Sequence, residues 1–169
     1  MKKYELTDDT ITVGGRILHR IKALKSFSDV EEGDLGGYVE KEDNLDHSGE
    51  AWVSGNARVY GNAWVSGDAW VYGDARVYGD ARVSGDARVS GDARVSGEND
   101  YAAAKGFGRE YRTTTFFRLQ DGGIGVRCGC FCGTLEEFRE KVKETHKESK
   151  MGKEYLMLAD LMEYKFKNA

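Results

Sequence analysis

The residues best suited to chemistry lie between Gly49 and Glu98, where arginine, tryptophan and tyrosine recur at fixed positions of a six-residue unit, Gly-(Asn/Asp)-Ala-(Arg/Trp)-Val-(Ser/Tyr). Arginine binds phosphate and stacks on aromatic rings, and tyrosine and tryptophan stack on nucleobases. If three units form one turn, side chains eighteen residues apart stack in columns. The candidate ligand-binding or interface residues, all expected to point outward, are Trp52, Arg58, Trp64, Trp70, Tyr72, Arg76, Tyr78 and Arg94.

These columns have two interpretations. Three exposed tryptophans indicate an interface, because large exposed apolar patches usually mark one, and a homotrimer is the expected assembly. Alternatively, a groove between subunits holds an anionic small molecule such as a nucleotide. The residues expected to line that groove are Trp70, Tyr72, Arg76 and Tyr78.

The arginine column strengthens the second interpretation. Arg58, Arg76 and Arg94 are each one turn apart, so their like charges should lie about 5 Å apart and repel one another. Neutralisation requires corner aspartates such as Asp74 and Asp92, carboxylates of a partner, or phosphates of a ligand. A host protein or an anionic ligand is therefore one expected partner of the column, and pairing with aspartates of the same chain is the alternative.

Alternation within the repeat predicts how these columns are positioned. In Ala-Arg-Val-Ser the alanine and valine share one face and the other two residues share the opposite face. The Gly-Asp pair that follows suits a tight corner. Such a short strand cannot bury its apolar face alone, so the units must stack as a solenoid. The pattern resembles the hexapeptide-repeat family, which implies a mainly β fold: a left-handed parallel β-helix of about 3.5–4 coils.

The first coil is expected before the clear repeat, in residues 28–48. Leu35 lies eighteen residues before Val53, and Val39 takes an alanine position in the same register. Leu45 also falls on an alanine position, whereas His47 falls on a valine position and fits poorly. The helix is therefore assigned to residues 28–98.

The remaining segments predict two flanking modules. Residues 1–27 form an N-terminal β-hairpin cap, since two strand-like runs flank Gly14-Gly15. Residues 99–112 form a linker, with one helical turn over 101–105. Residues 113–169 form a small α+β C-terminal domain: a hairpin around 121–123, a helix from the capping box that begins at Thr134, and a second helix over 153–165.

Cysteine and histidine decide whether a metal or a catalytic site is expected. Cys128, Cys130 and Cys132 alternate, so a continuous strand would place three thiols on one face, with His146 as a fourth zinc ligand. Zinc ligands are usually spaced more widely, and free cysteine packs well as a small hydrophobe. These four residues are therefore only weak candidates, and we predict no metal and no cofactor.

Hexapeptide acyltransferases resemble this chain in the repeat and use a histidine base near a protruding loop. The stretch from Gly49 to Glu98 has neither a histidine nor an insertion. The three histidines are His19, His47 and His146, far apart in sequence. We therefore predict no catalytic residues and a non-catalytic binding protein. An acyltransferase and a purely structural trimerisation module remain the alternatives.

Segments outside the repeat carry a more specific resemblance. They are Arg20 to Leu24, Gly33 to Tyr38, Val126 to Phe131 and Gly133 to Phe138. Together with the repeat, they resemble a group of hexapeptide-repeat proteins from phages and prophages of Gram-positive bacteria. The resemblance implies an accessory role, for example counter-defence by sequestering a host signalling nucleotide or masking a host protein.

Composition limits the compartment and the partners. The net charge is −4, so nothing requires a nucleic-acid partner. There is no signal-peptide pattern and no apolar run of the roughly 20 residues that would span a bilayer. The odd cysteine count does not indicate a disulfide framework. The expected location is the cytoplasm of an infected or lysogenic bacterial host.

Overall fold

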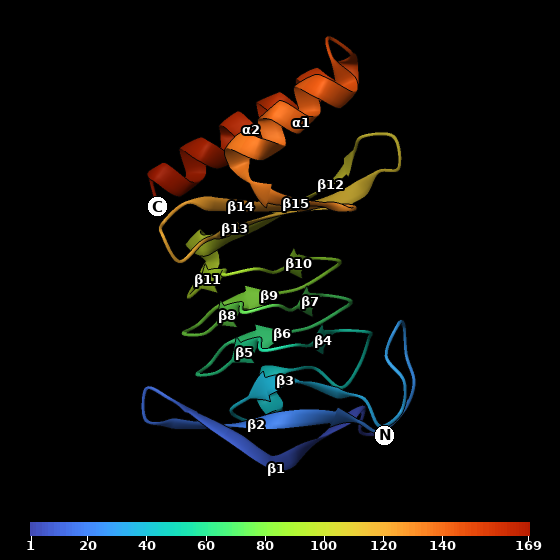
Figure 1. The fold of residues 1–169 in the computed structure, drawn as a ribbon, viewed down its shortest axis with the longest axis vertical. Coiled ribbons are helices and arrows are strands. Elements are labelled where there is room, and N and C mark those ends of the chain that lie inside the picture. The colour runs from blue at the N-terminus through green and yellow to red at the C-terminus, as the bar shows by residue number, and fades with distance from the viewer.

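A computed structural model describes all residues, 1–169, and the fold is mainly β (Figure 1). A parallel β-solenoid of three turns occupies the middle of the molecule, with an N-terminal hairpin at one end and an antiparallel sheet and two helices at the other. Each repeat contributes one two-residue strand. These strands are β4 (Trp52–Val53), β5 (Arg58–Val59), β6 (Trp64–Val65), β7 (Trp70–Val71), β8 (Arg76–Val77), β9 (Arg82–Val83), β10 (Arg88–Val89) and β11 (Arg94–Val95).

Strand pairing sorts the repeats onto three faces. The first face is the sheet β10-β7-β4, and the third face is the pair β6-β9. The second face contains β5, β8 and β11 and continues through β3 (Leu35–Val39) into the N-terminal hairpin. Partners on a face are eighteen residues apart, as Trp52 with Trp70 and Arg58 with Arg76. The predicted columns of side chains are therefore present.

From Val53 to Val95, alanine and valine are the residues that each repeat directs into the solenoid interior. All eight repeat valines from Val53 to Val95 are fully buried, and the repeat alanines are at most 1 % exposed. Glycine makes the corners, and at Gly73 the backbone has a φ of +70°. A β-carbon there would also lie 3.1 Å from the backbone nitrogen of Gly91, one coil further on. A larger residue is therefore strained at this corner.

The first coil differs from the expected register. Val39 pairs with Val59 and Leu45 pairs with Val65, so both occupy valine positions. Leu35 is 55 % exposed instead of lying inside. The expectation of an eighteen-residue step was wrong here, because the corner that contains His47 has two more residues than later corners, and the step is twenty residues.

The hairpin of β1 (Tyr4–Val13) and β2 (Arg16–Ala23) closes the first coil, as predicted. Each coil donates its N–H groups to carbonyls of the next coil, so the carbonyls of the first coil have no coil beneath them. Side chains of the cap supply the missing hydrogen-bond donors. Lys3 Nζ donates to the Ala51 carbonyl (2.7 Å), and Tyr4 Oη donates to the Leu45 carbonyl (2.8 Å). Burial lowers the pKa of Lys3 to about 8 and raises the pKa of Tyr4.

A four-stranded antiparallel sheet covers the last coil. Its strands are β12 (Tyr101–Phe107), β13 (Arg112–Arg118), β14 (Ile124–Cys128) and β15 (Phe131–Thr134), paired in that order. Successive side chains of β13 point to opposite sides of the sheet and join two separate hydrophobic cores. Phe117 packs into the solenoid core, and Phe116 packs into the core between the sheet and the helices. Here the last coil needs acceptors, and Thr115 Oγ1 accepts the N–H of Arg88 at 2.9 Å.

The predicted helical turn over 101–105 was wrong. These residues belong to β12, which pairs with β13 from Tyr101 to Ala104. Small side chains suit this edge strand because helix α2 packs against it. Residues 101–107, which the sequence assigned to a linker, are therefore part of the sheet. The hairpin of β13 and β14 lies where it was expected.

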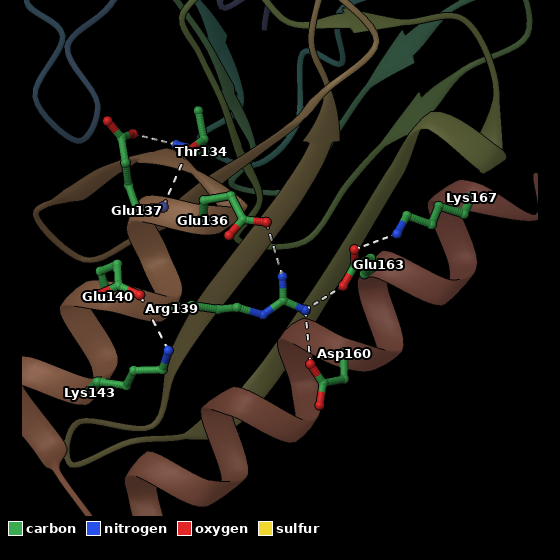
Figure 2. Close-up of polar contacts among 9 residues, drawn as sticks. All are labelled: Thr134, Glu136, Glu137, Arg139, Glu140, Lys143, Asp160, Glu163 and Lys167. Carbon is green, nitrogen blue, oxygen red and sulfur yellow. Dashed lines mark hydrogen bonds and ion pairs between the residues drawn. The ribbon is translucent and has the colours of Figure 1, made fainter.

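Helices α1 (Leu135–His146) and α2 (Lys150–Lys167) lie on the far side of this sheet. Thr134 and Glu137 form the predicted capping box of α1, and Arg139 joins the helices by ion pairs to Asp160 and Glu163 (Figure 2). Hydrogen bonds from Lys167 and Arg139 lower the pKa of Glu163. Neither helix is long and apolar enough to span a membrane.

Candidate functional site

A cleft of about 700 Å³ opens on the first face of the solenoid. Two loops project on this side of the molecule: the loop between β2 and β3, and the turn between β12 and β13 (Figure 1). Asp29 comes from the first loop, Tyr111 comes from the second, and Trp70 lies on the wall between them. The cleft thus combines the cap, the repeat and the C-terminal sheet.

Two arginines lie over aromatic rings in this wall. The register of β7 and β10 puts Arg88 beside Trp70, and the guanidinium carbon of Arg88 is 5.1 Å from the centre of the indole. Arg127, from β14, lies 5.8 Å from the centre of the Tyr72 ring. Such cation–π contacts hold a guanidinium in place while its N–H groups remain free to donate.

The cleft has an excess of free positive charge. Arg112, at the start of β13, is the third arginine of the lining, and none of Arg88, Arg112 and Arg127 makes an ion pair within the chain. Lys105 differs because it pairs with Asp86. That hydrogen bond lowers the pKa of Asp86 and raises the pKa of Lys105. Three guanidinium groups therefore remain available to an anion.

The loop residues add an aromatic ring and two carboxylates. Tyr111 is 69 % exposed, and its φ of +50° lies in the left-handed region that side chains larger than that of glycine rarely adopt. Asp29 and Glu110 also line the cleft and make no ion pair. An organic anion with hydrogen-bond donors elsewhere in the molecule matches this set of groups.

The predicted site residues do not share one site. Trp70 and Tyr72 lie together in the cleft. Arg76 and Tyr78 lie on the second face, so within one chain they do not share a groove with Trp70 and Tyr72. Trp52 is only 2 % exposed, and the expectation that it points to solvent was wrong because the cap covers it.

The arginine column of the second face is in register as predicted. Arg58 and Arg76 make no ion pair with the corner aspartates. Two of these aspartates, Asp74 and Asp80, instead accept hydrogen bonds from asparagine side chains one coil earlier. Arg94 is bound within the chain, because it donates to three backbone carbonyls and to Gln120. Only part of the column therefore faces a potential partner.

The third face repeats the aromatic–arginine pair in a different setting. Arg82 lies over Trp64 at 5.6 Å, and Trp64 is 38 % exposed. A smaller hollow of about 360 Å³ surrounds them, and its lining includes the carboxylates of Glu42, Asp43 and Asp46. An anion is therefore disfavoured at this hollow.

The three cysteines do not share a face. Gly129, with a φ of +58°, and Cys130 form a turn, so the continuous strand expected up to Cys130 was wrong. Cys128 faces the helices, where its sulfur lies 3.8 Å from the Tyr155 hydroxyl, and Cys132 lies beside Ser90 of the solenoid. Neither the cysteines with His146 nor any other His, Cys, Asp or Glu residues form a cluster of three that could hold a metal ion.

The histidines lie outside the cleft. His19 Nδ1 lies 3.0 Å from the Thr7 carbonyl in the cap. The ring of His47 stacks on Tyr4 at 4.3 Å, where His47 Nδ1 accepts the N–H of Lys3. The cleft residues missed from the sequence, Arg112 and Arg127 above all, are brought there by the C-terminal sheet.

Comparison with known proteins agrees with this architecture. The family model of the YdcK β-solenoid repeat matches residues 51–67, 69–85 and 75–89, all within the solenoid. No curated protein was found to match the chain. The chain is thus a repeat β-solenoid protein, and its similarity to that family is confined to the repeat.

Proposed function

We propose that this chain is a non-catalytic binding protein that sequesters an anionic small molecule, in particular a signalling nucleotide. The observation that carries the proposal is the cleft on the first face. There Arg88 and Arg127 lie over Trp70 and Tyr72, and neither arginine has a carboxylate partner. Such guanidinium groups offer paired N–H donors that match phosphate oxygens.

The positions of the histidines favour binding over turnover. An acyltransferase of the hexapeptide type would need a histidine base at its cleft. His47 is the histidine nearest to the repeat, and it is held against Tyr4 at the end of the solenoid. The cleft lining contains neither histidine nor cysteine. Acyl transfer therefore remains the weaker proposal.

The proposed setting is a phage or prophage of a Gram-positive bacterium, with the protein acting in the cytoplasm of the infected or lysogenic host. The segments that support this setting lie toward the two ends of the molecule. Arg20 to Leu24 and Gly33 to Tyr38 lie in the cap and the first coil, and Val126 to Phe131 and Gly133 to Phe138 lie in the C-terminal sheet and the start of α1. A binder without turnover suits counter-defence, because it can remove a host signal from solution. Masking of a host protein is the alternative mode.

We also propose a homotrimer assembled through the second and third faces. Trp64 is exposed there, and Arg58 and Arg76 have no ion-pair partner in the chain. Corner aspartates of a second copy recur at the same spacing as these arginines and would neutralise them. Mass from light scattering at micromolar concentration tests this, and a monomer overturns it.

The test of sequestration is recovery of the ligand. Purified protein is incubated with a panel of nucleotides, separated from free ligand, and heat-denatured, and the supernatant is analysed by mass spectrometry. We expect a bound nucleotide to be released chemically unaltered. Arg127→Ala should lose it, whereas Arg82→Ala, which removes the equivalent contact on the third face, should retain it. A hydrolysed or acylated product would identify an enzyme instead, and failure of every nucleotide to bind would refute nucleotide capture.

A further inference from the structure

The aromatic rings of the cleft wall are already covered. The Arg88 guanidinium lies over Trp70, and Arg127 lies over Tyr72. A nucleobase that stacked on the same ring faces would have to displace the arginines. These rings are therefore better suited to position the guanidinium groups than to bind a base, and the phosphates of a ligand belong at this wall.

The free charge of the wall indicates more than one phosphoryl group. Arg88, Arg112 and Arg127 come from three different strands and line one cleft without ion-pair partners. Each guanidinium can bind two oxygens of one phosphate, so three of them exceed what a single phosphate monoester requires. Two linked phosphates supply enough oxygens and negative charge for all three.

A base then has one free aromatic surface, Tyr111. This ring lines the cleft from the turn between β12 and β13 and is 69 % exposed. Its backbone is held in the left-handed region at a φ of +50°, which disfavours tyrosine and suits glycine. A strained, exposed aromatic residue at the rim of a cleft is consistent with a functional role for its side chain.

The two carboxylates fit the remaining part of a nucleotide. Asp29 and Glu110 line the same cleft and make no ion pair. Carboxylates accept hydrogen bonds from ribose hydroxyls and from amino groups of bases but repel phosphates. They therefore weaken the binding of ligands that are only polyanions relative to ligands that carry a sugar.

From these features we infer that the ligand is a nucleoside diphosphate, with its two phosphates on the arginine wall and its base on Tyr111. The inference rests on the proposed function and names the ligand class of the same site. It makes Tyr111 the residue that distinguishes a nucleotide from an inorganic anion.

Calorimetric titration with inorganic phosphate, pyrophosphate, ADP, GDP, CDP, UDP and the matching monophosphates tests it. Since stacking of a base on an aromatic ring is worth about 1–3 kcal/mol, at least one diphosphate should bind about 10-fold tighter than pyrophosphate. The corresponding monophosphate should bind about 10-fold more weakly than that diphosphate, because one phosphate contact is lost.

Tyr111→Gly removes the ring that would contact the base and leaves the fold intact, because glycine readily adopts the backbone conformation found there. It should lower the ratio of diphosphate to pyrophosphate affinity about 10-fold, because the stacking contribution of the base is lost while the carboxylates remain. Arg127→Ala should weaken both ligands about 10-fold, and Arg82→Ala should change neither by more than about twofold. Circular dichroism shows whether each variant is folded.

The outcomes distinguish the two proposals. If no phosphate, pyrophosphate or nucleotide binds, the proposed anion capture is wrong. If pyrophosphate binds at the arginines but no diphosphate binds more tightly, or if Tyr111→Gly leaves their ratio unchanged, anion capture stands and the inference about the base is overturned. Equal affinity for monophosphate and diphosphate would overturn the assignment of two phosphates.

Discussion

Arg88 on Trp70 and Arg82 on Trp64 are the same local structure at two repeats, with arginine–ring distances of 5.1 and 5.6 Å. Their surroundings have opposite charge. Arg88 lies in the cleft of about 700 Å³, which is lined by four basic and three acidic side chains, whereas Arg82 is the one arginine in a hollow of about 360 Å³ lined by three carboxylates. The repeat therefore supplies the same pair on two faces, and segments outside it decide what each pair can bind.

The difference arises from how the two ends of the chain pack on the solenoid. On the first face, the C-terminal sheet contributes Arg112 and Arg127. On the third face, the first coil contributes the acidic corner around Glu42 and Asp46. A solenoid with one repeated sequence thus gains distinct sites only where non-repeated segments lie against it.

Disrupting the valine and alanine interior, which supports both faces, should have the largest effect on stability. Val71 follows Trp70 and precedes Tyr72 in the sequence, and its side chain is fully buried in the solenoid interior. Val71→Asp would place a carboxylate without partners there. We expect the free energy of unfolding to fall by about 4 kcal/mol or more. Urea unfolding followed by circular dichroism measures this.

The control for Val71→Asp is Ser84→Asp, which introduces the same group at an exposed position of the solenoid. It should change stability by less than about 0.5 kcal/mol. Equal effects of the two variants would mean that the interior does not hold the faces together.

Charge reversal at the two arginines tests the comparison itself. Arg88→Glu replaces a free guanidinium of the cleft by a carboxylate, so nucleotide affinity should fall on the order of 100-fold. Arg82→Glu should change it by less than about twofold, because that residue lies on another face in an acidic hollow. Titration calorimetry compares them, and similar losses would show that the cleft is not the anion site.

The sequence predicts the solenoid well because its information is periodic. A step of eighteen residues places Trp70 and Arg88 in one column, and the structure contains that column. Burial of Trp52 could not be seen in the same way, since it depends on how Tyr4 and Phe27 of the cap pack against it. The two extra residues around His47 also shift the register, and the poor fit of His47 to a valine position was the local sign of that shift.

The remaining cleft residues have no periodic signal. Arg112, Arg127 and Tyr111 reach the first face because β13 packs on the last coil through Phe117 and Thr115. That packing is tertiary and joins segments distant in sequence. The sequence therefore predicted the part of the wall that the repeat supplies, Trp70, Tyr72 and the Arg88 column, and missed Arg112 and Arg127, which come from the C-terminal sheet.

Loss of the hydrogen bond between β13 and the last coil should have a smaller effect on stability. Thr115 is fully buried, and its hydroxyl accepts the Arg88 N–H, which has no further coil to donate to. Thr115→Val keeps the shape but leaves that N–H unsatisfied, at a cost of about 1–3 kcal/mol in the free energy of unfolding. Thermal unfolding measures it, and an unchanged midpoint would mean that the sheet does not close the last coil through this bond.

Truncation of the two tryptophans should have the smallest effects, and it should separate binding from assembly. Trp70→Ala removes the ring under Arg88, and a cation–π contact of about 0.5–2 kcal/mol corresponds to a loss of nucleotide affinity of roughly fivefold. Trp64→Ala should leave that affinity unchanged, because Trp64 lies outside the cleft. If the third face packs in the trimer, Trp64→Ala should instead raise the concentration at which light scattering detects dissociation, and Trp70→Ala should not. Reversed results, with Trp64 needed for the nucleotide and Trp70 for assembly, would show that the roles of the two faces had been exchanged, although their local geometry is the same.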